Sequence, residues 1–144
     1  MAGGERVIEV EARVRFGETD RYDVAHSSCY LTWFELARVE LLRACGLTIR
    51  DFDEAGVLIP VREFSAKLLA PIRYDDLIVI RARLTELTPL KIAITYEIVA
   101  KGDDRTLATG TTLNVSVSAT TGRPTKLPAL LLDALRRVQP PATS

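Results

Sequence analysis

One stretch of this chain is apolar around most of a helical circumference, and it limits the possible folds more than any other feature. Residues 28–45 read SCYLTWFELARVELLRAC, with apolar side chains recurring at intervals of three and four residues. This spacing predicts an amphipathic helix, and Gly46 stands where such a helix ends. Further apolar residues widen the stripe, so the helix must be largely buried and the rest of the chain has to cover it.

The remaining sequence supplies β-strands for this purpose. Residues 7–16 alternate apolar and charged side chains, which predicts a half-exposed strand. Residues 57–69 look extended, with Pro60 near an edge or at a bulge. Three long strands joined by short turns follow at residues 77–86, 90–100 and 106–118. A short terminal helix is expected at residues 128–138. Neighbouring strands with short links form an antiparallel meander, so we expect an α+β fold in which an antiparallel sheet wraps one long central helix.

The composition fits one globular domain spanning residues 1–144, with flexible ends at 1–5 and 139–144. Nineteen basic residues balance nineteen acidic ones, which argues against a nucleic-acid partner held by a broad basic surface. No apolar run approaches the ~20 residues of a membrane span. The N-terminal sequence lacks the apolar block of a signal peptide. We therefore expect a cytoplasmic protein with no membrane partner.

The two cysteines, Cys29 and Cys45, do not have the spacing of metal ligands. On one helix they would lie roughly 24 Å apart at ~1.5 Å per residue. A disulfide needs Cα atoms within ~7 Å, so we interpret both as small buried apolar residues. We expect no metal and no cofactor.

The loop before the long helix is the candidate site. Residues 17–30, GETDRYDVAHSSCY, place Glu18, Asp20, Asp23 and His26 close to a helix N-terminus. Free N–H groups and the positive end of the helix dipole can polarise a carbonyl there. A carboxylate beside them can attack as a nucleophile or activate a water molecule. Acidic loops before helices often serve only as caps, so the residues alone leave capping and catalysis both open.

Residues 14–47 carry a more specific pattern, made of the motif E-T-D, a tyrosine ten residues after Asp20 and the run W-F-E-x-A-R-x-E. This pattern resembles the signature of hotdog-fold acyl-CoA thioesterases of the 4-hydroxybenzoyl-CoA thioesterase type. Two later blocks, FSAKLLAPIRYDDLIVI and GTTLNVSVSATTGRPTKLP, also resemble that family, so the similarity covers nearly the whole chain. The resemblance implies a hotdog fold and a hydrolase of acyl-CoA or acyl-carrier-protein thioesters that assembles as a homodimer or homotetramer.

The resemblance also implies roles for single residues. Asp20 takes the position of the catalytic carboxylate, as nucleophile or general base. The main-chain N–H of Ser27, at the start of the long helix, takes the position that holds the thioester carbonyl. Tyr30 and Glu35 take supporting positions at the substrate. Tyr30 and Trp33 also fit plain packing in the core.

Two departures from the family pattern concern the same loop. The family often has glycine three residues after the aspartate, where this chain has Asp23. Many relatives have histidine or asparagine seven residues after the aspartate, where this chain has Ser27, and His26 stands one residue earlier. We therefore expect His26 in the wall of the binding pocket rather than as the base.

Three further residues are candidates for substrate binding. Glu63 stands in a predicted strand, where an ion pair with a nearby arginine is the simpler interpretation. Arg123 and Lys126 belong to the turn G-R-P-T-K and are the first candidates to bind the phosphates of CoA or phosphopantetheine. A chain without net charge does not attract a phosphate-bearing substrate from a distance, so recognition of the phosphates would depend on such a local cluster. An apolar pocket is expected for the acyl group, with possible lining from Tyr22, Tyr30, Trp33, Phe64 and Leu68.

Two alternatives to hydrolysis stay open at this point. One is a hotdog hydratase or dehydratase, whose D-x-N-P-x-H-like segment is not matched here because Asp20 and His26 are one residue further apart and no Asn-Pro lies between them. The other is a non-catalytic acyl-binding protein of the same fold, against which the intact Asp20 argues.

Overall fold

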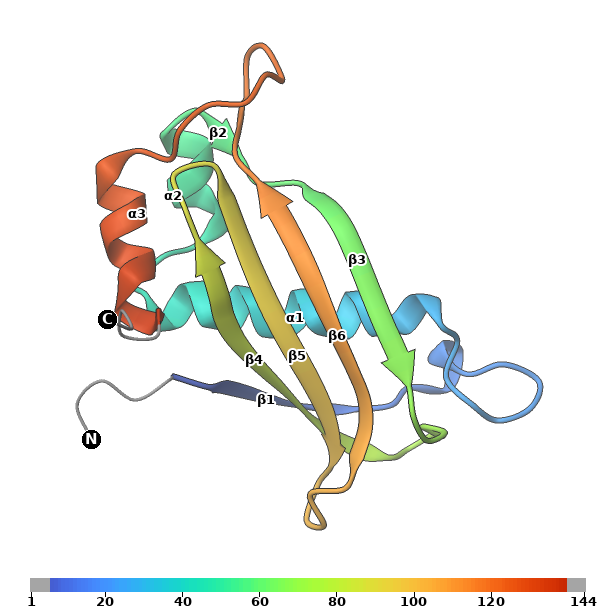
Figure 1. The fold of residues 1–144 in the computed structure, drawn as a ribbon. Helices are drawn as coiled ribbons and strands as arrows, with labels where there is room; N and C mark the ends of the chain where they lie inside the picture. Colours follow the sequence, from blue (N-terminus) through green and yellow to red (C-terminus); the bar gives the residue numbers. More distant parts are fainter. Residues whose placement is uncertain (1–5, 140–144) are drawn as a thin grey trace.

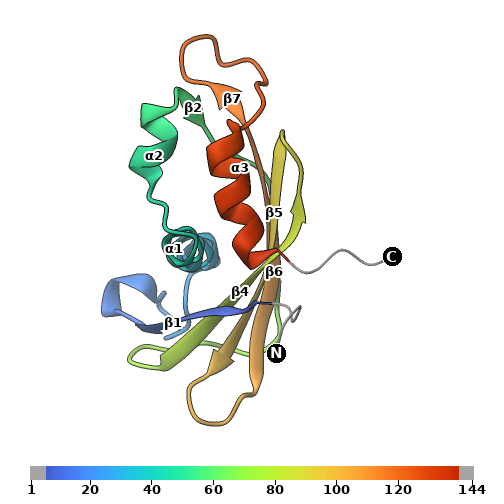
Figure 2. The ribbon, with the colours of Figure 1, turned by 90° about the vertical axis from the view of Figure 1, so that its left-hand side faces the viewer.

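A long helix, α1 (Ser28–Ala44), packs on one face of a five-stranded sheet in the computed structural model, which describes residues 6–139 (Figure 1). The strand order is β1-β4-β5-β6-β3, and every neighbouring pair is antiparallel. The strands are β1 (Ile8–Arg13), β3 (Val61–Leu68), β4 (Leu77–Leu87), β5 (Lys91–Ala100) and β6 (Thr106–Val115). Viewed nearly along α1, the sheet bends around the helix (Figure 2). The expected α+β hotdog arrangement is confirmed.

Shorter elements close the ends of this layer. They are η1 (Phe16–Glu18), α2 (Ile49–Glu54), α3 (Ala129–Leu135), η2 (Arg136–Val138) and a two-stranded pair of β2 (Val57–Leu58) with β7 (Val117–Ser118). The expected flexible ends, 1–5 and 139–144, lie outside the described residues except for Gln139. Within the described part of the chain, no helix is long and apolar enough to cross a membrane.

The apolar stripe of α1 forms the centre of the core, as its spacing predicts. The buried side chains of this helix are Tyr30, Trp33, Phe34, Ala37, Leu41 and Leu42. The opposite side is less covered than expected, because Leu36 is 40% exposed. Gly46 ends the helix region with a φ of +81°, and the Leu47 N–H donates to the Leu42 carbonyl.

Three strand boundaries differ from the sequence prediction. β1 ends at Arg13, and Phe16 begins the short turn η1 with its side chain 78% exposed. The segment 57–69 divides at Pro60 into β2 and β3. Pro60 indeed lies at an edge, because β3 is the last strand of the sheet and carries a bulge just after Val61. The final strand likewise divides into β6 and β7.

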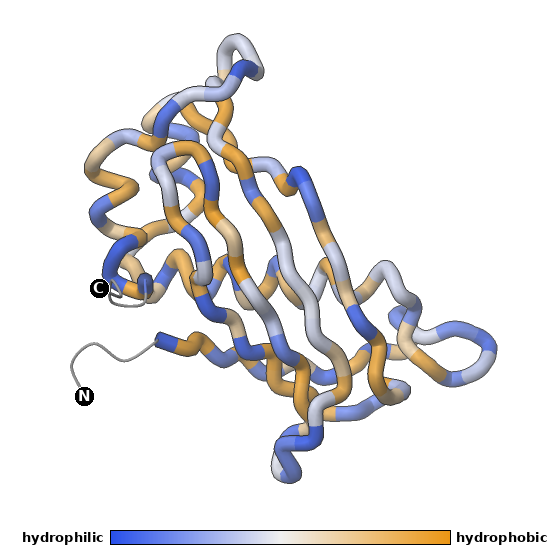
Figure 3. The backbone as a smooth tube through the Cα atoms, in the orientation of Figure 1, coloured by the Kyte–Doolittle hydropathy of each residue, from blue (hydrophilic) through white to orange (hydrophobic). Residues whose placement is uncertain are grey.

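Hydropathy alternates along the central strands, as it does in a sheet with one covered face (Figure 3). β6 is the exception, because its core-facing side is small or polar: Ala108, Gly110, Thr112, Asn114 and Ser116 are buried. The aromatic rings of α1 and β5 fill the space that these small residues leave. Phe34 stacks on Tyr96 with a centroid distance of 4.4 Å and an interplanar angle of 10°.

Candidate active site

The loop between η1 and α1 is a short hairpin that carries Asp20. Thr19 pairs with Ala25, the Asp20 N–H donates to the Val24 carbonyl over 2.8 Å, and the His26 N–H donates to the Glu18 carbonyl over 2.8 Å. These bonds hold the two sides of the hairpin together and lead its second side directly into α1. The carboxylate and the start of the helix are therefore placed by one continuous, hydrogen-bonded segment.

The Asp20 side chain is half-buried and helps to close its own turn. Its Oδ1 accepts the Tyr22 N–H at 2.8 Å and the Val24 N–H at 3.4 Å. Asp23 completes this turn with a φ of 63°. That left-handed conformation is easiest for glycine and tolerated by aspartate, which is consistent with an aspartate at a position where the family pattern often has glycine.

The N-terminus of α1 is open to solvent beside this hairpin. Ser27 is the N-cap residue, and its side chain makes no capping hydrogen bond. The N–H groups of Cys29 and Tyr30 donate to the carbonyls of His26 and Ser27. Among the described residues the Ser27 N–H has no backbone acceptor, and both His26 and Ser27 are exposed. A free donor thus stands at the positive end of the helix.

Tyr30 and Trp33 lie in the core one turn further along α1. Each is 3% exposed, and their rings meet edge to face with a centroid distance of 5.3 Å. Burial raises the pKa of Tyr30, and the neighbouring Cys29 adds to the effect, which keeps the phenol neutral. Glu35 is half-buried and pairs with Arg38 over 3.7 Å. The packing interpretation therefore holds for both aromatic residues, whatever further role they have.

A surface pocket of about 440 Å³ opens beside the hairpin, between the end of β1 and the outer side of α1. Leu36 and Val39 form its apolar wall, and Trp33 links that wall to the core. Glu18 and Glu35 contribute polar groups to the same pocket. The pocket therefore joins apolar surface to ionisable groups close to the loop that carries Asp20.

Glu18 is the residue of this site to which the sequence assigned no role. It is only 8% exposed, and its carboxylate accepts the Arg15 N–H at 2.8 Å and the Arg15 guanidinium at 3.3 Å. Burial by itself raises the pKa of Glu18, but the hydrogen bonds and the charge of Arg15, with a smaller contribution from the Trp33 indole, outweigh burial and hold this pKa below its ordinary value. In the sequence, the only indication that Glu18 belongs to the site is that it is the first acidic residue of the E-T-D motif.

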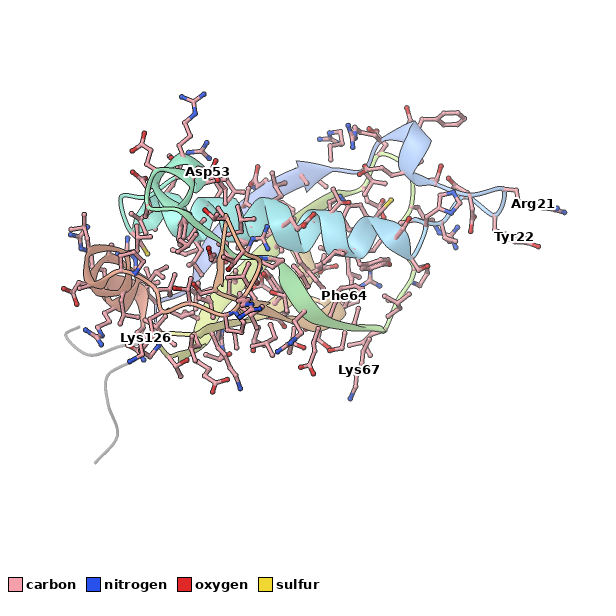
Figure 4. The ribbon with its side chains drawn as sticks, turned by 90° about the horizontal axis from the view of Figure 1, so that it is seen from above. Arg21, Tyr22, Asp53, Phe64, Lys67 and Lys126 are labelled. Atoms are coloured by element: carbon pink, nitrogen blue, oxygen red, sulfur yellow. The ribbon has the colours of Figure 1, made fainter. Side chains whose placement is uncertain are left out.

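The two basic candidates lie on a different part of the fold from Asp20. Arg123 and Lys126 follow β7, and Lys126 lies at the end of the molecule opposite to Arg21 and Tyr22 (Figure 4). Tyr22 is 70% exposed at the tip of the hairpin, which does not fit the expected pocket wall.

The remaining candidates lie on the edge strand β3. Glu63 is exposed there, and no ion pair with an arginine is found for it within residues 6–139, so the simpler interpretation of this residue is wrong. Phe64 and Leu68 are 40% and 52% exposed.

Both cysteines are free thiols, Cys45 buried and Cys29 half-buried. In the described part of the chain, no group of three or more His, Cys, Asp and Glu side chains is placed to hold a metal ion.

Comparisons with known proteins agree with this architecture. A family model described as the thioesterase-like superfamily matches residues 14–135. The putative acyl-CoA thioesterase YneP of Bacillus subtilis is 28% identical over 92 residues, covering 64% of this chain and 67% of that protein. The acyl-CoA thioester hydrolase YbgC of Escherichia coli is 28% identical over 125 residues, covering 87% and 92%. The solved structure of the hypothetical protein TT1821 from Thermus thermophilus is similar with a TM-score of 0.84 and 30% identity, covering 91% and 98%. The chain belongs to the thioesterase-like superfamily.

Proposed function

We propose that this protein hydrolyses acyl thioesters of CoA or of an acyl carrier protein, with Asp20 as nucleophile or general base and the Ser27 N–H as the donor to the thioester carbonyl. Family membership supports thioester hydrolysis. The observation that carries the assignment of residues is the hairpin, which bears a carboxylate at its turn and continues into a helix N-terminus with a free N–H.

Two routes are open to the Asp20 carboxylate. As a general base, it takes a proton from a water molecule whose oxygen attacks the carbonyl carbon. The carbonyl electron pair moves to the oxygen, which the Ser27 N–H stabilises, and collapse of this intermediate expels the thiolate, which takes the proton from Asp20. As a nucleophile, the carboxylate attacks the carbonyl itself, expels the thiolate and leaves a mixed anhydride. Water hydrolyses this anhydride to the free acid, whose proton passes to the thiolate, and the Asp20 carboxylate is restored.

The hydrogen bonding of Asp20 is compatible with both routes. Its Oδ1 holds the turn by accepting two main-chain N–H groups. Within residues 6–139 no hydrogen bond to its Oδ2 is found, so that oxygen is available to water or to a carbonyl carbon. One carboxylate can therefore be oriented by one oxygen and react through the other.

The substrate contacts belong to the same proposal. His26 and Glu35 are proposed to contact the acyl end, with Tyr30 and Trp33 forming the buried floor. Glu63 lies on the edge strand β3, and Lys126 lies at the end of the molecule opposite to the hairpin (Figure 4). The proposed contacts of Glu63, Arg123 and Lys126 therefore need an extended substrate or a second copy of the chain. We accordingly propose a homodimer or homotetramer, and the cytoplasm stays the proposed location.

Replacing the carboxylate of Asp20 tests the assignment. Asp20→Asn keeps an oxygen for the Tyr22 N–H and so preserves the turn, but it removes the base. We expect turnover to fall by roughly 10²–10⁴-fold, the usual contribution of such a group. Release of free thiol is measured over a panel of aryl and aliphatic acyl-CoA thioesters and then with an acyl carrier protein.

The control is Asp133→Asn, which removes an exposed carboxylate paired with Arg136 on the distant helix α3 and should leave turnover unchanged. Full activity of Asp20→Asn would exclude the role of Asp20. No thiol release by the parent protein would exclude hydrolysis, and water addition to an enoyl-CoA would then favour the hydratase alternative.

A further inference from the structure

The buried carboxylate of Glu18 contacts two of the segments that build the site. It receives the main-chain N–H of Arg15 at 2.8 Å, which closes η1 after the first strand. It also shares a pocket wall with Trp33, which belongs to the second turn of α1, and the Trp33 indole helps to lower the pKa of this carboxylate. The side chain thus joins the end of β1 to the long helix.

The main chain of Glu18 holds the third segment. Its carbonyl accepts the His26 N–H at 2.8 Å, at the point where the hairpin returns to α1. The Cys29 thiol donates to the same carbonyl over 3.5 Å. Asp20 follows two residues after Glu18 on the first side of the hairpin, and Ser27 follows directly after His26 on the second. Any movement of Glu18 is therefore transmitted to the proposed carboxylate and to the proposed N–H donor.

The contacts of Glu18 require an ionised carboxylate rather than a side chain of similar shape. The main-chain N–H and the guanidinium of Arg15 donate to its two oxygens, and the Trp33 indole favours its charged form. A buried charge is tolerated only when such donors surround it. An amide in its place offers one carbonyl oxygen and turns an NH₂ group toward a donor, so at least one of these contacts must open.

We propose that Glu18 is a positioning residue for the thioester hydrolysis proposed above, fixing the hairpin that carries Asp20 against α1 through its hydrogen bonds to Arg15 and its buried place beside Trp33. It touches neither the carbonyl nor the attacking water. Its effect comes from alignment, because a displacement of ~1 Å between reacting groups can reduce the rate about 10²-fold.

Glu18→Gln is the direct kinetic test, and Glu40→Gln is its matched control. Glu40 also pairs with an arginine three residues away, on the exposed part of α1, so both variants lose one negative charge and one such pair. We expect Glu18→Gln to lower kcat by about 10–100-fold with KM nearly unchanged, since alignment is lost but binding is kept. Glu40→Gln should retain the parent values.

The single tryptophan provides a readout that depends on the contact itself. Trp33 is the only tryptophan of the chain, so its indole N–H gives one resonance in a ¹H–¹⁵N spectrum. In the parent and in Glu40→Gln this resonance should shift on acidification as Glu18 gains a proton. In Glu18→Gln it should differ at neutral pH and lose that titration. A purely structural role would lower the melting temperature without changing kcat per folded molecule.

Glu18→Asp keeps the test decisive if Glu18→Gln fails to fold. This variant keeps the charge but is one methylene shorter, so we expect an intermediate kcat. The proposal is overturned if the folded Glu18 variants keep the kcat of the parent. It is also overturned if the Trp33 indole resonance is the same in these variants as in the parent. These results are distinct from failure of the proposed function, which shows as full activity of Asp20→Asn whatever Glu18 does.

Discussion

At the scale of single residues, Gly110 provides the space in which α1 meets the sheet. A Cβ atom at this position of β6 would lie 2.3 Å from Phe34 Cε2 and 2.6 Å from the Ser65 carbonyl oxygen of the adjacent strand. Neither neighbour can withdraw easily, because Phe34 is stacked on Tyr96 and the carbonyl belongs to the sheet. Only glycine fits between them.

Gly110→Ala should therefore destabilise the fold by about 1–3 kcal/mol, the usual cost of overpacking a core. Urea unfolding followed by circular dichroism measures this change. Gly17→Ala is the control, because a Cβ atom there meets nothing within 4 Å. Equal stability of the two variants would contradict the assigned role of Gly110.

At the scale of elements, the edge strand β3 leaves apolar side chains without cover. Phe64 and Leu68 are 40% and 52% exposed, and Lys67 points away from α1 (Figure 4). An uncovered edge strand is a template for pairing with another chain. This edge is the element on which the proposed assembly of identical chains depends.

Leu68→Lys tests that assembly by placing like charges at the edge. We expect the parent to behave as a dimer or tetramer in light scattering coupled to size exclusion, and Leu68→Lys to shift toward the monomer. Leu130→Lys is the control, since Leu130 is 81% exposed on α3, outside the sheet. A monomeric parent would rule out the proposed oligomer.

At the scale of the whole molecule, the buried phenol of Tyr96 makes the stability of the fold depend on pH in the alkaline range. Burial raises the pKa of Tyr96 to about 12, although its hydrogen bond with Thr112 over 2.9 Å opposes the shift. The ordinary pKa of tyrosine is about 10. The stability that this difference contributes is complete below pH ~10 and is lost as the pH rises toward 12, because only the unfolded chain ionises there.

Tyr96→Phe should consequently flatten the loss of stability between pH ~10 and 12, which corresponds to about 2–3 kcal/mol for two pKa units. Urea midpoints measured across that range give the slope. Tyr22→Phe, which removes an exposed phenol at the hairpin tip, is the control. Identical slopes in all three proteins would contradict a buried neutral Tyr96.

The sequence by itself determined the central helix, the long strands in their order along the chain and the loop that carries Asp20. Periodicity is sufficient for these because residues close in the chain decide which side of a helix or strand is apolar. The residues at which strands end were harder to predict from the sequence. β1 stops at Arg13 because Glu18 closes a turn on Arg15, a contact that alternation of side chains does not reveal.

Only the tertiary structure decided which face of β6 is buried and what Glu18 does. The more apolar face of β6 is the half-exposed one, because the core needs small residues where the rings of Phe34 and Tyr96 stack. Glu18 is one acidic side chain in an acidic loop, and its burial beside Arg15 and Trp33 depends on elements that meet only in the fold. Both results depend on groups brought together from distant parts of the chain, and a periodic pattern carries no information about such contacts.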